Sequence, residues 1–215
     1  MSSRLLNCKT FFEIAYNQRY TWPGNFKGYK GSCLYSNNQA SYQGEFSVNE
    51  KFNVDVCNIK NDEIVKLITA QLFEVTIHRV KRDFERVHSE NNFEPIRDND
   101  RGLEMIVSGK NQGDKYRIKD NKINMVFRNI HGIIVEIFVE EFLDTGKGFL
   151  SKKYTSQQLE KESKVPISPK YNYLDEFINI YDNLWILNKR SIMHLDDQSK
   201  PIIQTYNFNN LTTLN

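Results

Sequence analysis

Several features that define common protein classes are missing from this sequence. Its 215 residues include three cysteines, Cys8, Cys33 and Cys57, with no C-x-x-C pair. A disulfide framework or a structural zinc site is therefore not expected, and a reducing compartment is the simplest setting. No apolar run approaches the roughly 18 residues of a membrane-spanning helix. Lys and Arg number 29 against 27 Asp and Glu, a balance that excludes a nucleic-acid binder driven by phosphate neutralisation.

The sequence also lacks common catalytic motifs. There is no G-x-S-x-G nucleophile elbow, no H-x-x-x-H metal pair, and the glycines around Lys110 and Lys147 lack the spacing of a phosphate-binding loop. Glu140 and Glu141 are adjacent on an expected strand, so their side chains face opposite ways. We therefore assign no catalytic residue, metal or cofactor, and expect binding rather than catalysis.

The first residues carry no recognisable targeting signal. The apolar stretch after Met1 is too short for a secretory signal, and Ser2 stands where myristoylation needs glycine. We expect a cytoplasmic protein, or a stromal one if the gene lies in a plastid.

What the sequence does contain is aromatic and strand-forming. Aromatic residues make up 13% of the chain, and such side chains favour sheets. A chain of this length is expected to form one domain over residues 1–215.

Two helices are expected. Phe11, Phe12, Ala15 and Tyr16 recur at helical spacing within 10–18, which predicts a short amphipathic helix. The longer helix, 62–82, begins after a cap at Asn61 or Asp62. Its apolar residues form two stripes, Ile64, Ile68, Leu72 and Val75 on one side and Phe73, Ile77 and Val80 on the other, so both faces should be covered. The alternative is that 73–77 is a strand, because Val, Thr and Ile are dense there.

Alternating and apolar runs predict about nine to eleven strands. Asn37-Asn38, Asp120-Asn121 and His131-Gly132 mark tight turns between some of them. Residues 143–170, broken by glycines and prolines, are expected to be irregular. The runs lie at 29–36, 39–48, 52–57, 103–109, 114–119, 122–130, 133–142, 174–181, 184–194 and 202–208.

Together these elements predict an α+β fold. Successive strands joined by short turns form an antiparallel meander, and so many twisted strands should curl into a strongly curved sheet or part-barrel. The N-terminal helix docks on it, and the longer helix covers its concave face.

Four segments also resemble a known family. They are similar to a family of uncharacterised proteins from cyanobacteria and plant plastids, classed as a domain of unknown function. The resemblance spans nearly the whole chain and implies a photosynthetic source, a single domain and no assigned catalytic residue. The segments that carry it are 19–23 with Gly28-Tyr29, 71–74 running into 77–82, 128–132, and 144–148.

The last third is faintly similar to lipoprotein carriers, in which an open half-barrel holds acyl chains under a helical lid. The segment Tyr181-Asp182-Asn183-Leu184-Trp185, then Lys189-Arg190 and a final strand at 206–208, carries this likeness.

Candidate ligand-binding residues follow from the expected fold. His78, Arg79 and Arg82 lie close to the core-facing stripe of the longer helix and could hold a carboxylate or phosphate. The alternative is that they collect there because cations stabilise a helix C-terminus. Tyr20 and Trp22 could form the mouth of a pocket, or pack the first helix on the sheet. His131 could contact the ligand, or simply tolerate its turn.

Three functions are therefore open. The first is a carrier or binding module for an apolar or amphipathic ligand, such as a lipid, a pigment or a precursor, in a photosynthetic cell. The second is an assembly or structural factor that acts on a photosynthetic protein partner through its surface. The third is a chromophore lyase-type enzyme. Neither nucleic acid nor a membrane-spanning segment is expected.

Overall fold

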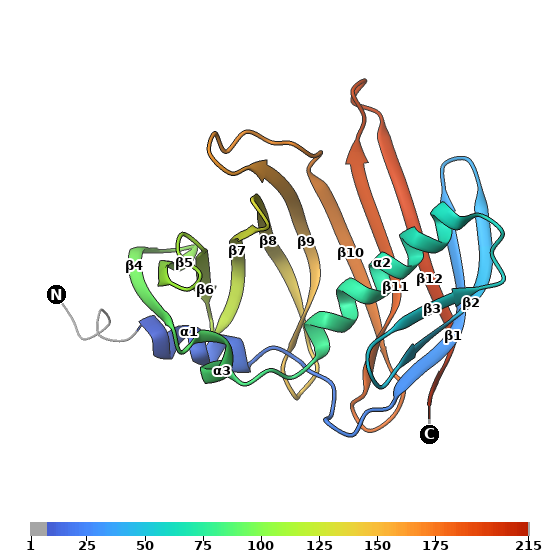
Figure 1. Ribbon diagram of the computed structural model, residues 1–215, viewed down its shortest axis with the longest axis horizontal. Helices are drawn as coiled ribbons and strands as arrows, with labels where there is room; N and C mark the ends of the chain where they lie inside the picture. Colours follow the sequence, from blue (N-terminus) through green and yellow to red (C-terminus); the bar gives the residue numbers. More distant parts are fainter. Residues whose placement is uncertain (1–7, 215) are drawn as a thin grey trace. The chain divides into compact units, whose positions relative to one another are not determined.

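The computed structural model describes residues 8–214 and consists mostly of antiparallel strands with three helices (Figure 1). Twelve strands follow one another in a sheet that is not closed, in the order β3-β2-β1-β12-β11-β10-β9-β8-β7-β6-β5-β4. The chain divides into two compact units. Unit 1 comprises 8–20 and 82–172, and unit 2 comprises 21–81 and 173–214. The predicted single domain stays a prediction.

Unit 1 contains two helices and the strands from β4 to β9, each antiparallel to the next. Helix α1 contacts β4, β6, β7 and α3. The elements are α1 (Cys8–Asn17), α3 (Phe84–His88), β4 (Asn91–Asn99), β5 (Gly102–Gly109), β6 (Lys115–Lys119), β7 (Lys122–Ile130), β8 (Ile133–Asp144) and β9 (Phe149–Glu160).

The core of unit 1 is built around α1. Cys8, Phe12, Ala15 and Tyr16 are buried, at the i, i+4, i+7 and i+8 spacing of one helix face. They pack with buried residues of α3 and of the strands, among them Phe84, Phe93, Met105, Val107, Tyr116 and Ile118. Phe11, expected on this face, is 38% exposed instead.

Unit 2 contains one long helix and the other strands, with β12 between β1 and β11. Helix α2 crosses one face of these strands (Figure 1). The elements are β1 (Gly28–Asn37), β2 (Ser41–Asn49), β3 (Val54–Cys57), α2 (Asp62–Arg79), β10 (Tyr171–Asn179, its first two residues in unit 1), β11 (Trp185–Leu195) and β12 (Pro201–Thr213).

Helix α2 is capped and anchored by polar contacts. The Asn61 side chain accepts hydrogen bonds from the amides of Glu63 and Ile64, at 3.0 and 3.3 Å, as its position predicted. Arg190 of β11 donates from Nη1 to Gln71 Oε1 at 2.8 Å, and binds Asp175 with Nε and Nη2. One buried guanidinium therefore ties the helix to the strands.

The first stripe predicted on α2 is confirmed, and the second is only partly covered, because Ile77 and Val80 are half-buried. Ile64, Ile68, Leu72 and Val75 are buried, whereas Phe73 is 51% exposed. The helix ends at Arg79 rather than at residue 82, because Val80 is extended and the amide of Trp22 donates to the Arg79 carbonyl at 2.8 Å. The strand alternative for 73–77 is wrong.

Three elements were missed in the sequence. Helix α3 begins after Asp83, whose side chain caps the amide of Arg86. Strand β9 occupies part of the segment expected to be irregular, because pairing with β8 satisfies the backbone of a polar sequence. Strand β4 contains Pro95, which is tolerated at an outer strand and accompanies a register shift towards Arg97. The count of nine to eleven strands is therefore corrected to twelve.

The predicted meander is confirmed within two runs of strands, β1–β3 and β4–β12. It is not continuous, because β1 pairs with β12, and β3 and β4 are at opposite ends of the strand order. The predicted strong curvature of the sheet stays a prediction. Within residues 8–214, no helix is long and apolar enough to cross a membrane. The expectations for residues 1–6 lie outside the described residues.

Candidate functional site

A hollow of about 420 Å³ lies in unit 2, and we call it the Trp22 pocket. It forms where the segment before β1 meets the turn between β2 and β3 and the C-terminal end of α2. Its lining is Trp22, Pro23, Gly24, Asn25, Phe26, Lys27, Glu50, Lys51, Phe52, Arg79, Val80 and Lys81.

Aromatic rings form one part of this pocket. Trp22 is 3% exposed, and its ring centroid lies 4.9 Å from that of Phe26 and 6.2 Å from that of Phe52, whose ring is stacked on it at an interplanar angle of 22°. The indole Nε1 donates to the Trp185 carbonyl at 3.1 Å, which fixes the ring. Tyr29 packs behind, 5.6 Å from Trp22, and burial raises its pKa far above the usual value, so it is neutral.

The backbone at Phe52 is strained. Phe52 has a φ of 63°, which is unusual for a bulky residue. The Asn49 side chain holds this turn by accepting hydrogen bonds from the amides of Lys51 and Asn53, at 2.9 and 3.0 Å. Strain of this kind persists only where the surrounding contacts impose it, and it gathers at functional sites.

Positive charge forms the other part of the lining. Lys27, Lys51, Arg79 and Lys81 are accompanied by one carboxylate, Glu50, which pairs with Lys27 at 3.2 Å. The Arg79 guanidinium also lies 5.7 Å from the ring centroid of Phe177. The pocket therefore combines flat apolar walls with a cationic rim.

Of the six predicted ligand-binding residues, the structure brings two together. Trp22 and Arg79 line the same pocket, although their sequence positions are far apart. His78 is exposed on α2 and is not part of the lining. Ligand binding by these residues stays a prediction.

The other three predicted residues belong to unit 1. Tyr20 is 2% exposed, and its amide donates to the Phe149 carbonyl at 3.0 Å. Arg82 is exposed between α2 and α3. His131 is exposed in the turn between β7 and β8, with a φ of 51°.

Sequence reasoning missed Phe52, Lys27 and Lys51. Lys81 lies in the basic end of the predicted helix and could have been included with Arg79. Phe52 was expected to begin the strand at 52–57, but β3 begins at Val54 and Phe52 lies in the turn that Asn49 holds.

A second hollow, of about 570 Å³, lies in unit 1 at the turns of the β4–β5 and β6–β7 hairpins. Its lining carries the carboxylates of Asp98, Asp100 and Asp120 beside Arg97 and Lys119. These are turn residues at the ends of strands, and the hollow lacks the enclosed rings of the Trp22 pocket.

Within residues 8–214, no group of three or more His, Cys, Asp or Glu side chains could hold a metal ion. Cys8 and Cys33 are buried and free, as expected for small core residues. Cys57 is exposed, because its side of the short strand β3 faces away from the core.

Comparison with known proteins identifies the family of this chain. The chain belongs to the family described as "Protein of unknown function (DUF3386)", whose model matches residues 4–214. This confirms the predicted membership of a family of unknown function, while the source stays a prediction. No curated protein matches the sequence.

Among solved structures, a DUF1329 family protein from Desulfovibrio piger is similar to this chain. The two share 8% identity over 95% of this chain and 92% of the other, with a TM-score of 0.27. A likeness at this level supports no argument about ligand or mechanism.

Proposed function

We propose that the protein is a non-enzymatic binding module that holds an amphipathic anion in the Trp22 pocket. The observation that carries this proposal is the stacked pair Trp22 and Phe52 in one hollow with Arg79 and the lysines. The apolar part of the ligand lies against the rings, and its negatively charged group lies at the cationic rim. The volume, about 420 Å³, is within the usual range for a small-molecule site.

This proposal places the ligand at the end of α2 and not beneath it. Ile68 and Leu72 on the inward face of α2 have no exposed surface, so packed side chains occupy the face that the sequence had suggested for the ligand. The Trp22 pocket has access to solvent beside exposed Lys51 and Lys81.

The ligand class is a lipid, a pigment or a precursor that carries an acidic group. The resemblance noted in the sequence supports a photosynthetic cell as its setting, and the cytoplasm or plastid stroma as its compartment. We retain a photosynthetic protein as a further partner in this proposal.

The first experiment is a titration of the protein with oleate, followed by tryptophan fluorescence, because Trp22 lies in the pocket. We expect saturable binding. Neutralising two rim charges in Lys51→Gln/Lys81→Gln should weaken it about tenfold, which corresponds to ~1.4 kcal/mol. The matched control is Lys60→Gln/Lys66→Gln, which removes two exposed lysines outside the lining and should bind oleate like the original protein.

The charged group and the apolar part are tested separately. Oleyl alcohol has the same chain length without the carboxylate, so it should bind more weakly than oleate and be insensitive to the lysine variants. Equal affinity of the rim variant and the control for oleate would refute the proposed pocket. Native mass spectrometry of protein purified from its own cells should show a bound acidic small molecule, and its absence there would count against a carrier.

A further inference from the structure

The hollow of about 570 Å³ in unit 1 contains apolar side chains that solvent reaches. Phe11 of α1 and Ile96 of β4 belong to its lining, and they are 38% and 45% exposed. Leu103 of β5 and Ile118 of β6 add further apolar side chains to it. Exposed apolar side chains with a polar rim are typical of a surface that binds a partner.

Two local features place Phe11 and Ile96 in this hollow. Phe12 is 1% exposed in the core, so its neighbour Phe11 lies on a different side of α1. In β4 the register shifts between Pro95 and Arg97, so Ile96 is an extra residue without a partner on β5. Such a β-bulge redirects the side chains of its strand. As a result, the consecutive residues 95–99 all line the hollow.

The two hairpin turns that form the rim are held to each other. Lys119 Nζ donates to the Asp100 carbonyl at 2.9 Å, and Asn124 Nδ2 donates to the Arg101 carbonyl at 3.1 Å. Gly102, with a φ of 116°, permits this close approach, because a Cβ atom there would lie 2.3 Å from a carbonyl oxygen of β6. The rim is therefore a fixed structure.

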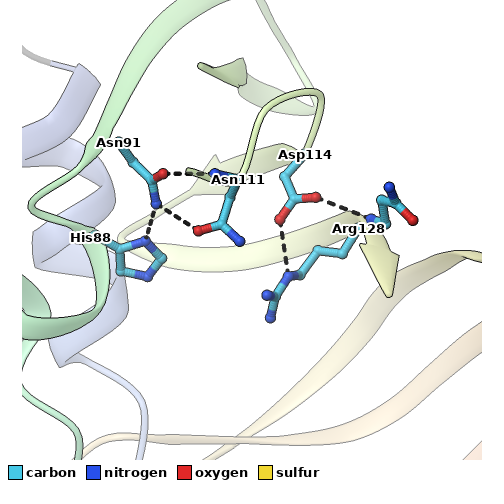
Figure 2. Close-up of polar contacts among 6 residues, drawn as sticks. His88, Asn91, Asn111, Asp114 and Arg128 are labelled. Atoms are coloured by element: carbon cyan, nitrogen blue, oxygen red, sulfur yellow. Dashed lines mark hydrogen bonds and ion pairs between the residues drawn. The ribbon is translucent and has the colours of Figure 1, made fainter. Parts of the chain in front are cut away.

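A buried polar network holds the other end of these strands (Figure 2). Asn91 Nδ2 donates to Asn111 Oδ1, and the Asn111 amide donates to Asn91 Oδ1, both at 2.9 Å. Asn91 Nδ2 also donates to Nδ1 of His88 at 3.0 Å, and this ring is neutral near pH 7 because burial lowers its pKa to about 4. Asp114, just before β6, accepts from Arg128 Nε at 3.1 Å. The strands that carry the hollow are thus fixed at both ends, which reduces the entropy lost on binding a partner.

Negative charge is in excess in the lining. Arg97 is compensated by the buried Glu104, which lies outside the lining, at 2.7 Å. Within residues 8–214, the three aspartates of the lining form no ion pair, so they and the ammonium group of Lys119 leave two negative charges. These exposed aspartates are Asp98, Asp100 and Asp120.

We propose that this hollow binds a basic segment of a partner protein, in which Lys or Arg side chains flank large apolar ones. The cations of the segment pair with the aspartates, and Arg can do so with two parallel hydrogen bonds. The apolar side chains of the segment lie against Phe11 and Ile96. The segment lies across the turns and does not extend the ladder of β4, because Pro95 and the bulge interrupt that ladder.

The openness of the rim favours a protein segment over a small molecule. Residues 98–100 and 119–121, from the two turns, are all exposed. A small ligand here would remain largely in contact with water, whereas small-molecule sites bury most of their ligand. The site is independent of the Trp22 pocket, because it lies in the other unit.

The test is calorimetric titration of the full chain with the peptide acetyl-GRLFKG-amide at constant ionic strength. We expect saturable binding. Replacing the basic residues of the peptide by glutamate (acetyl-GELFEG-amide), or its apolar residues by glycine (acetyl-GRGGKG-amide), should weaken binding at least about tenfold. Spermidine, a small cation without apolar side chains, should also bind at least about tenfold more weakly than acetyl-GRLFKG-amide.

Two variants test the lining. Asp98→Asn/Asp120→Asn removes two carboxylates, and Ile96→Gln removes an exposed apolar side chain, so each should weaken binding of acetyl-GRLFKG-amide, by about tenfold and about fivefold. The matched control is Glu90→Gln/Glu162→Gln, which removes two exposed carboxylates of the same unit outside the lining and should leave the affinity within about twofold.

Circular dichroism establishes that each variant is folded, as expected for substitutions at exposed positions. The proposal would be overturned by the absence of saturable binding, or by affinities of the two lining variants equal to that of the control. Acetyl-GELFEG-amide or acetyl-GRGGKG-amide binding as tightly as acetyl-GRLFKG-amide would overturn it too. Equal affinity for spermidine would assign the hollow to a small cation instead of a protein segment.

Discussion

Arg190 donates from Nε and Nη2 to both carboxylate oxygens of Asp175, at 2.8 and 2.7 Å, where each residue is only 2% exposed. The same guanidinium reaches Gln71 of α2 and lies 3.4 Å from Glu74. A buried pair of this kind is costly to break because Arg190 would lose its buried partner, and Glu74, whose side chain is 41% exposed, compensates its charge only in part.

The first prediction concerns this pair. Asp175→Asn should lower the free energy of unfolding by about 3–5 kcal/mol, measured by urea denaturation. Glu176→Gln is the matched control, since Glu176 pairs with Lys189 at 3.0 Å but its side chain is 47% exposed. We expect the control to cost less than about 1 kcal/mol. A similar loss in both variants would mean that the Asp175 pair has no special structural role.

The second prediction concerns pH. His88 has a folded-state pKa of about 4, below its ordinary value of 6.5, so the unfolded chain binds the extra proton between these two pH values. Stability should therefore be constant above about pH 6.5 and fall as the pH decreases towards 4, by at most about 3 kcal/mol from this residue.

The measurement is urea denaturation at pH 7 and at pH 4.5. His88→Phe keeps an aromatic ring in contact with Phe12 and removes the titrating group, so it should lose less stability between the two pH values than the original protein does. His131→Gln changes an exposed histidine and should retain the original pH dependence. An unchanged pH dependence in His88→Phe would contradict the assignment.

The third prediction concerns the start of α2. Asn61→Ala removes the acceptor for the amides of Glu63 and Ile64 and should cost about 1 kcal/mol of stability. Asn61→Asp preserves an acceptor and adds a negative charge at the helix N-terminus, so it should be neutral or slightly stabilising. Thermal unfolding of the two variants compares them directly, and equal losses would show that capping is not the cause.

The fourth prediction concerns His131, which the sequence suggested as a ligand contact. His131 and Gly132 have φ values of 51° and 87°, as in a two-residue hairpin turn that favours Asn-Gly. His131→Asn should therefore raise the unfolding free energy by about 0.5 kcal/mol and leave oleate binding unchanged. Weaker binding of oleate would restore a functional role for this histidine.

The sequence predicted those helices and strands whose formation depends on residues close together in the chain. The β7–β8 hairpin follows from two apolar runs joined by His131-Gly132, and the start of α2 follows from Asn61. Strand β9 could not be found in this way, because Ser151, Lys152 and Lys153 carry no strand pattern and are ordered by pairing with β8. Its existence depends on the partner strand.

In the candidate site too, the sequence indicated single residues but not the contacts between them. Arg79 and Trp22 were each recognised as unusual, but their contact depends on the Trp22 amide reaching the last carbonyl of α2. Arg190 gave no signal as the anchor of α2, since its partners Asp175 and Gln71 lie 15 and 119 residues away in sequence. Contacts between residues so far apart in the sequence exist only in the folded structure, and no local pattern indicates them.

The two outer strands have a consequence for self-association. Strand β3 is only four residues long, and β4 interrupts its ladder at Pro95 and presents exposed charges at Glu94, Arg97 and Asp98. Either edge strand offers few backbone groups in register for pairing with a strand of another molecule. At β4, such pairing would also remove water from charged side chains. Both edges therefore disfavour the pairing of sheets between molecules, the step by which fibrils grow.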